Sequence, residues 1–455
     1  MSDRKGSLVS VLGAAIVKFR SGVTLSDVIV WGFFCATCLH LAFLVPSGSL
    51  TPGYRAKIFS GLMCAATLAV VWFFRRPRDG GKVSGEVVVS AVLTVLTIIS
   101  GLLSSTPGPS TARGFVVLSS GLGGFWCARL LLNTESSQRF FRSFCLLILS
   151  VLLLACLWGY LSTGAIYELL DTNPHPVADR ILLLWFAPLS LLFAGSLLRR
   201  AVGGLHLLVS YVVFYLSDLR SAFLTPIVLV VLAAFFRMIR LRYVVLIVIL
   251  ASVATMFFVR QLPWTKIGTE HEPAYYRAEN YVFSLHIALK HPLLGIGLTA
   301  PRGEFLEDYE VKYPYVTKEK FAHSVTRIGV SENIFLTFMA ELGFPFVILY
   351  GVSLIILAAR LVREAFQPSG SSFLHPLALL LPITAGLLHF LVYDGLLHPQ
   401  VSWFFHILLG LIPMRNQESD TKLHSKKHNA QAPDRVLKSP LAPLCQRGAR
   451  GDFPL

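Results

Sequence analysis

Apolar runs of roughly 16 to 20 residues recur along most of this sequence, each long enough to cross the hydrocarbon core of a bilayer. Inside hydrocarbon the backbone has no water to bind, so runs of this length are expected to be helical. The composition agrees, since 54% of the 455 residues are hydrophobic and only 14% are charged. That is too few charges for an ordinary soluble domain. The sequence therefore predicts an all-α polytopic membrane protein.

The run lengths predict about twelve transmembrane helices. A short helix over Ile334–Leu342 is expected before the tenth, because Gly343 and Pro345 interrupt the apolar pattern there. The expected spans are 28–45, 58–74, 87–104, 114–131, 144–161, 181–198, 201–216, a run ending at 236, 243–259, 346–359, 377–392 and 401–413.

These spans divide the chain into five segments. A single long polar interval separates apolar runs, and it is expected to form a large loop with short helices, one of them from Pro273 to Leu289. In order, the segments are an interfacial or cytoplasmic N-terminus (1–26), helices one to nine (27–259), the large loop (260–328), helices ten to twelve (329–413) and a disordered tail (414–455).

Basic residues fall mostly on one side of the predicted membrane. The N-terminus, Arg75–Lys82, Arg199–Arg200, Arg237–Arg242 and the tail share a face, which the positive-inside rule assigns to the cytoplasm. Both termini are therefore expected to be cytoplasmic and the 260–328 loop to lie outside, in the periplasm of a Gram-negative cell. The net charge of +15 reflects orientation in a lipid bilayer, so no nucleic-acid partner is expected.

The cysteines give no sign of a disulfide framework or a metal centre. Six of the seven lie in apolar runs, Cys445 lies in the tail, and the large loop has none. No metal ligands are therefore predicted.

Arg220 departs from the apolar pattern in the tight turn S-D-L-R-S, on the outer side of the predicted membrane. It either extends to the lipid headgroups, or pairs with Asp218, or binds an anionic substrate at the floor of an outward-facing cavity. Arginine suits a phosphate because its planar fork donates two hydrogen bonds and stays charged.

Three polar residues close the large loop just before the short helix: His323, Arg327 and Glu332. Histidine and glutamate are the usual proton acceptors for activating a sugar hydroxyl, so His323 and Glu332 are candidates for a catalytic base. A structural role for either is the alternative.

Arg277 begins the expected loop helix, as a solvated surface residue or as a phosphate contact. Asp394 and His398 lie at the outer end of the eleventh span, where they line the same cavity or sit at the membrane interface.

Three segments of the sequence resemble one family, the O-antigen ligase and O-antigen polymerase superfamily of bacterial membrane glycosyltransferases. They are S-D-L-R-S-A-F at 217–223, K-H-P-L-L-G-I-G at 290–297 and S-E-N-I-F-L-T-F-M-A-E-L-G-F at 331–344. The resemblance covers roughly 28–413, with the motifs confined to 217–351.

The resemblance implies transfer of a glycan from undecaprenyl diphosphate to an acceptor outside the inner membrane, without metal or nucleotide cofactor. The acceptor would be lipid A-core or a growing polysaccharide. By the same resemblance Arg220 and Arg277 would bind the diphosphate, with Arg327 a further candidate, and Asn333 would line the cavity beside the catalytic base.

The sequence departs from the family at Glu332. Many ligases have a histidine there, whereas polymerase-like members often carry an acidic residue. The base is therefore either Glu332 or His323, and a repeat-unit polymerase is the alternative to a ligase. A lipid-linked glycan flippase is the rival from another class, although most predicted spans lack the ionisable groups a transporter needs. A structural assembly protein is the third possibility.

Overall fold

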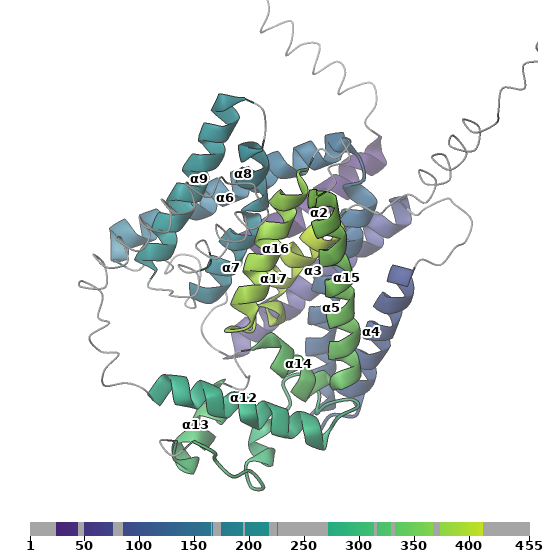
Figure 1. Ribbon diagram of the computed structural model, residues 1–455. Helices are drawn as coiled ribbons and strands as arrows, with labels where there is room; N and C mark the ends of the chain where they lie inside the picture. The colour runs from purple at the N-terminus through teal and green to yellow at the C-terminus, as the bar shows by residue number, and fades with distance from the viewer. Residues whose placement is uncertain are drawn as a thin grey trace, which may run out of the picture. The chain divides into compact units, whose positions relative to one another are not determined.

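All regular elements of the described structure are helices, as the sequence predicts (Figure 1). The computed structural model describes residues 24–43, 50–75, 85–164, 166, 174–193, 196–217, 225, 272–313, 316–328, 333–366 and 374–412. Within these ranges eight helical stretches are long and apolar enough to cross a membrane. The chain is a multi-pass membrane protein.

Seven of the eight candidate spans are single helices that match predicted spans. They are α2 (Leu25–Phe43), α3 (Leu50–Arg75), α4 (Gly85–Leu102), α5 (Pro107–Leu131), α6 (Glu135–Thr163), α9 (Leu197–Leu216) and α15 (Phe344–Phe366).

The remaining candidate span, His175–Leu192, differs from its prediction as one helix over 181–198. It consists of α7 (Pro174–Leu184) and α8 (Phe186–Leu192), which meet at Trp185. The Ser196 side chain caps the next helix by accepting a hydrogen bond from Arg199 N at 3.4 Å. Arg199 and Arg200 therefore lie in the first turn of α9 and do not end the preceding span.

The predicted count of twelve is matched only in part. The run ending at 236 and the run 243–259 lie outside the described residues. The last two predicted spans correspond to α16 (Pro376–Phe390) and α17 (Pro399–Gly410). At a rise of about 1.5 Å per residue both helices are shorter than the hydrocarbon core, because the chain between them folds into the 3-10 turn η3 (Gly395–Leu397).

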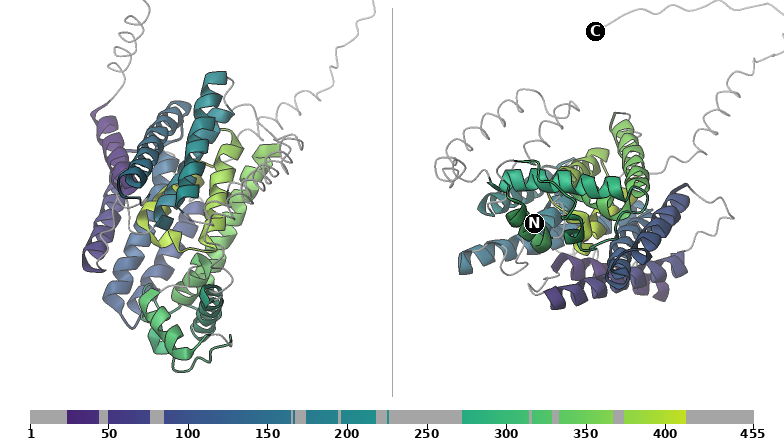
Figure 2. Two further views of the ribbon diagram at one scale, coloured as in Figure 1. Left: turned by 90° about the vertical axis from the view of Figure 1, so that its left-hand side faces the viewer. Right: turned by 90° about the horizontal axis from the view of Figure 1, so that it is seen from below.

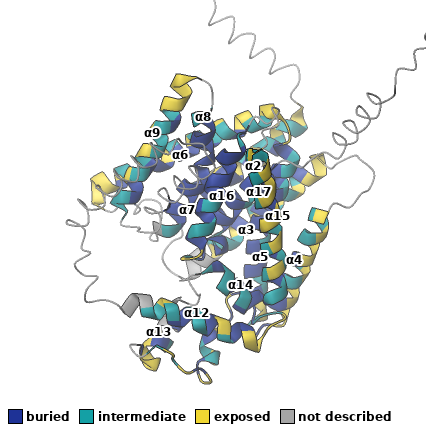
Figure 3. Ribbon diagram, in the orientation of Figure 1, coloured by how far each residue is buried: buried dark blue, intermediate teal, exposed yellow. Residues whose placement is uncertain are grey.

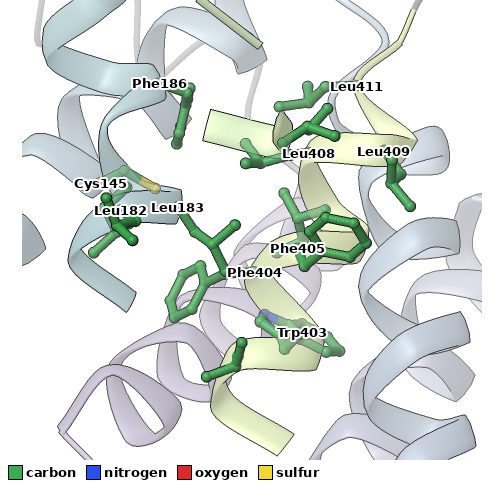
Figure 4. Close-up of a cluster of buried hydrophobic side chains, with 14 of the residues drawn as sticks. Cys145, Leu182, Leu183, Phe186, Trp403, Phe404, Phe405, Leu408, Leu409 and Leu411 are labelled. Atoms are coloured by element: carbon green, nitrogen blue, oxygen red, sulfur yellow. The ribbon is translucent and has the colours of Figure 1, made fainter. Parts of the chain in front are cut away.

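Helix α17 forms the centre of the described bundle and packs against α2, α3, α5, α7 and α16 (Figures 1 and 2). In Figure 4 its side chains Phe404 and Leu408 face Leu182 and Leu183 of α7. Trp403 is fully buried and lies against Gly124 of α5. A small residue at that position lets the two helices approach closely, as is common between membrane helices.

The outer helices carry exposed apolar side chains, whereas α7, α16 and α17 are almost wholly buried (Figure 3). On α6, for example, Leu147, Leu154 and Leu161 are 61%, 66% and 78% exposed. Large contiguous apolar surfaces are rare on soluble monomers, but lipid tails cover them at no cost in hydration. The burial pattern thus fits a bundle surrounded by lipid.

The large loop contains α12 (Glu272–Lys290), η2 (Arg302–Phe305) and α13 (Lys318–Ile328). Helix α12 confirms the predicted helix 273–289 and packs on α14 (Ile334–Leu342), crosswise to α15 (Figure 1). Phe283 and Ile287 of α12 are fully buried in an apolar cluster with Phe321 of α13. The loop therefore has a core of its own.

Candidate functional site

The second and third sequence motifs bind each other through their backbones. Helix α14 ends at Leu342 and is capped by Gly343, and the turns between Leu293 and Leu298 pass along its C-terminal end. Ile296 N donates to Ala340 O at 3.0 Å, Gly297 N to Glu341 O at 2.9 Å, and Phe344 N to Pro292 O at 2.9 Å. The first two bonds go to carbonyls at the C-terminal end of the helix, where no backbone N–H of the helix itself is available.

Two glycines make this approach possible. Gly295 has φ +63°, and a Cβ placed there would lie 2.3 Å from the backbone carbon of Glu341. Gly343 has φ +84°, and its Cβ would lie 2.5 Å from the carbonyl oxygen of Leu293. Each motif thus needs a glycine where the other motif crosses it. The G-x-G pattern of Gly295 and Gly297 is therefore a packing element.

A buried ion pair fixes the same junction. Arg302 donates to Glu341 Oε1 through Nε at 3.2 Å and through Nη2 at 2.8 Å, and both side chains are at most 1% exposed. Thr299 N donates to the other carboxylate oxygen at 3.0 Å, and Arg302 Nη1 donates to Ser284 Oγ of α12 at 3.0 Å. The glutamate of the third motif therefore holds the loop to α14.

A second buried carboxylate, Glu279 of α12, organises the chain after η2. It accepts hydrogen bonds from the backbone N–H groups of Lys312 at 2.9 Å and Tyr313 at 2.8 Å, and from the Tyr309 hydroxyl. Burial and the bond to Glu279 raise the pKa of Tyr309, so the phenol stays protonated and donates. These bonds fix the loop against α12, two residues from Arg277.

The start of α14 meets the connection between α16 and α17. Asn333 caps α14 by accepting from Phe335 N and Leu336 N at 3.1 and 3.2 Å, and its Nδ2 donates to Leu391 O at 3.0 Å. One turn later Thr337 Oγ1 donates to Asp394 Oδ1 at 3.0 Å, with Asp394 only 3% exposed. Two sequence-predicted residues, Asn333 and Asp394, thus lie on either side of one junction.

At this junction a row of polar and ring side chains extends into the core; we call Asp179, His389, His175, Tyr393 and His398 the ring row. Asp179 of α7 hydrogen-bonds His389 of α16, and neither side chain is exposed. The His175 ring stacks on Tyr393 with 4.6 Å between centroids and lies 5.5 Å from the His389 ring. Tyr393 Oη and His398 Nε2 are 2.6 Å apart.

Positive charges surround the ring row. Arg277 of α12 interacts electrostatically with His175, and Lys57, Arg113 and Arg180 act on His398. Arg180 is fully buried, and its guanidinium donates to the carbonyls of Leu41 and Ala42 at the end of α2. An anionic ligand at the junction would therefore meet a positive field.

The comparison with known families agrees with the geometry. Residues 205–351 match the family model described as O-antigen ligase. The chain carries an O-antigen ligase domain. The domain runs from α9 into α15, so it contains both interlocked motifs, the buried Arg302–Glu341 pair and α12. The family comprises membrane enzymes of ligase or polymerase type in polysaccharide biosynthesis. No curated protein matches the chain.

Several sequence-predicted residues of the ligase domain lie outside the described residues. Arg220 and Glu332 are outside altogether, and Arg327 lies in α13 with its side chain outside the description. His323 is exposed on α13, which packs against η2. Within the described chain, no hydrogen bond or ring contact joins His323 to the ring row. Arg277, Asn333, Asp394 and His398 are the predicted residues that the structure brings toward one junction.

Sequence reasoning missed most of the ring row. Of its five residues, only His398 is among the site residues that the sequence predicts. One local signal was present, since Asp179 and Arg180 stand at the very start of an apolar run. Charges inside a membrane segment usually mark a functional site or a buried pair.

The described residues offer no group of three or more His, Cys, Asp or Glu side chains arranged for a metal ion. They do include an apolar groove of about 490 Å³ between α3, α4 and α5. Its lining is too apolar to position a sugar, although it suits a lipid chain. The groove is lined by Ile58, Leu102, Pro107, Gly108, Thr111, Ala112 and Phe115.

Proposed function

We propose that the chain transfers a glycan from undecaprenyl diphosphate to an acceptor sugar, as an O-antigen ligase. The supporting observation is the meeting of Arg277, Asn333 and the ring row at one junction inside and beside the ligase domain. Transfer needs cations for a diphosphate leaving group and polar side chains for a sugar hydroxyl, and this junction offers both.

In this proposal Arg220, Arg277 and Arg327 bind the diphosphate. Their charge offsets the negative charge that grows on the leaving oxygen as the bond to the sugar breaks. Glu332, or His323 in its place, removes the proton from the acceptor hydroxyl, while Asp394 and His398 line the acceptor side. No metal or nucleotide is needed, because the diphosphate ester already carries the free energy of transfer.

The proposed site lies on the outer side of the inner membrane, with the loop 260–328 in the periplasm and both termini in the cytoplasm. Support comes from the basic residues of Arg75–Lys82 and Arg199–Arg200, which the predicted order of spans assigns to the opposite side from the loop. Lipid A-core would then reach the site from the outer leaflet.

A repeat-unit polymerase is the second candidate, and Glu332 favours it, because polymerase-like members of the family often carry an acidic residue at that position. A strain lacking the gene distinguishes the two. Loss of a ligase leaves undecaprenyl-linked polymer, whereas loss of a polymerase leaves single undecaprenyl-linked repeat units. If neither accumulates outside and the lipid-linked glycan stays in the cytoplasmic leaflet, the chain is a flippase and the proposal is wrong.

A further inference from the structure

The ring row connects a fully buried acid–base pair to half-buried rings at the junction. Asp179 and His389 have no exposed side-chain surface. His175 and Tyr393 are half-buried, and their rings stack at 4.6 Å. Because His175 lies 5.5 Å from His389 and interacts with Arg277, it stands between the buried pair and the proposed diphosphate-binding residue. The row thus leads from the proposed site into the core.

The hydrogen bond between Asp179 and His389 joins α7 to α16, but a purely structural contact at this place would not require a carboxylate. No described residue donates a hydrogen bond to Asp179 Oδ2, although this atom is buried. Gly395 covers it so closely that a Cβ there would lie 2.8 Å from Oδ2. A buried carboxylate oxygen without a donor is costly, and apolar side chains often replace buried ion pairs without loss of stability. The carboxylate is therefore better explained by a charge that it meets during the reaction.

We infer that the ring row receives the proton that the acceptor hydroxyl releases, with His175 holding the proton and Asp179 and His389 as positioning residues. This inference rests on the proposed function. As transfer occurs, the acceptor oxygen bonds to C1 of the donor sugar, and the bond from C1 to the diphosphate oxygen breaks. The diphosphate leaves with the electron pair. The catalytic base passes the proton to a nitrogen of His175, which later releases it to water.

Charges of both signs lie around His175. The Asp179 carboxylate hydrogen-bonds His389, whose ring lies 5.5 Å from the His175 ring, and we assign this carboxylate as the counter-charge to a protonated His175. Arg277 acts in the opposite sense until a donor diphosphate neutralises it. The other charged groups near the row are Arg180 on α7, Lys57 and Arg113 on α3 and α5, and Asp394, which accepts from Thr337. Donor binding therefore prepares His175 to accept a proton.

The test is a pH–rate profile of the full chain in lipid nanodiscs, with an undecaprenyl-diphosphate oligosaccharide and lipid A-core as substrates. For His175→Gln we expect kcat to fall at least about tenfold, donor KM to stay nearly unchanged, and the acid limb attributable to His175 to vanish. For Asp179→Asn we expect a smaller fall and an acid limb at lower pH, because the proton on His175 loses its counter-charge.

Glu86→Gln is the control, since Glu86, like Asp179, is a carboxylate that joins two helices of the bundle, although it is only partly buried and its partners are Arg129 and Arg360. It should leave kcat and the profile unchanged. If Asp179→Asn does not accumulate, His175→Gln carries the test alone. Two outcomes overturn the inference, provided that the wild type is active. One is a wild-type pH–rate profile in His175→Gln, and the other is a fall in kcat that is equal at every pH. Absence of transfer by the wild type with ligase and polymerase substrates overturns the proposed function itself.

Discussion

The Arg302 guanidinium of the loop donates two hydrogen bonds to the Glu341 carboxylate of α14, at 3.2 and 2.8 Å, and both side chains are at most 1% exposed. Removing one partner would leave the other charge buried without compensation. For Glu341→Ala we expect a loss of about 3–5 kcal/mol in the free energy of unfolding and much less protein in the membrane. Thermal unfolding in detergent and immunoblotting measure both.

The exposed pair Lys290–Asp308 is the control for this substitution. Asp308→Asn should leave the melting temperature unchanged, because solvent screens exposed ion pairs. Equal melting temperatures for Glu341→Ala and the wild type would contradict the structural role assigned to Glu341.

Gly295→Ala tests the interlocking of the two motifs. The new methyl group would meet the Glu341 backbone at 2.3 Å, and φ +63° adds strain. Gly164 separates the two effects, since it has φ +76° but nothing within 4 Å of its Cβ position. We expect Gly164→Ala to lower stability by about 1–2 kcal/mol and to keep activity, and Gly295→Ala to abolish activity. Comparable activity in both variants would argue against the close packing.

Arg220→Lys is expected to lose most of the transfer activity although the charge is kept. A single ammonium group cannot reproduce the two-point hydrogen bonding of a guanidinium to a diphosphate. Polymer on the cell surface is measured in a complemented deletion strain at equal protein level. Arg139→Lys is the control, because Arg139 forms an exposed pair with Glu135 one turn away on α6. Normal polymer with Arg220→Lys would indicate an arginine that only reaches lipid headgroups.

Glu332→Gln should lower activity at least about tenfold while the protein accumulates normally, because glutamine keeps the shape of the side chain but cannot take a proton. His323→Ala is the paired variant, and His323 is exposed on α13. Retained activity in Glu332→Gln with loss in His323→Ala would make His323 the base. Activity in both would move the first proton transfer to His175, Asp394 or His398.

The proposed orientation is tested by labelling single cysteines. Lys312 is exposed on the loop, so Lys312→Cys should react with an impermeant maleimide in intact spheroplasts, whereas Ser425→Cys should not. Cys445 is first replaced by serine, because it lies in the tail. The described cysteines are buried except for the half-buried Cys35, so they give little background. Labelling at Ser425→Cys but not at Lys312→Cys would contradict the proposed orientation.

The sequence predicts those parts of the fold that depend on local signals. Run length gives seven of the eight candidate spans, and Gly343 gives the end of α14. Run length alone does not predict the break at Trp185, although Pro188 is a local cause, because proline cannot donate a hydrogen bond to the carbonyl of Leu184 four residues earlier. The run lengths also predict full membrane spans where the structure has the shorter helices α16 and α17. Hydrophobicity alone does not show that the chain leaves the helix at Leu391.

The site is less predictable because its contacts are distant in the sequence. Asp179 and His389 are 210 residues apart, and the sequence around either residue does not indicate that the other is its partner. Asp394 and His398 were found because they lie at the end of an apolar run, and Asn333 was found through the family resemblance. Glu341 stands in a recognisable motif, but only the structure shows that it pairs with Arg302 and so holds the loop to α14.

The contact of Arg180 with α2 constrains the order in which the protein is assembled. The carbonyl of Ala42 accepts from a guanidinium 138 residues later in the chain. During synthesis α2 therefore enters the bilayer well before the cation that binds its end, and those carbonyls must be hydrated near the membrane surface or sheltered by an insertase until α7 arrives. Shortening the nascent chain before Arg180 should thus leave α2 loosely inserted and open to proteolysis.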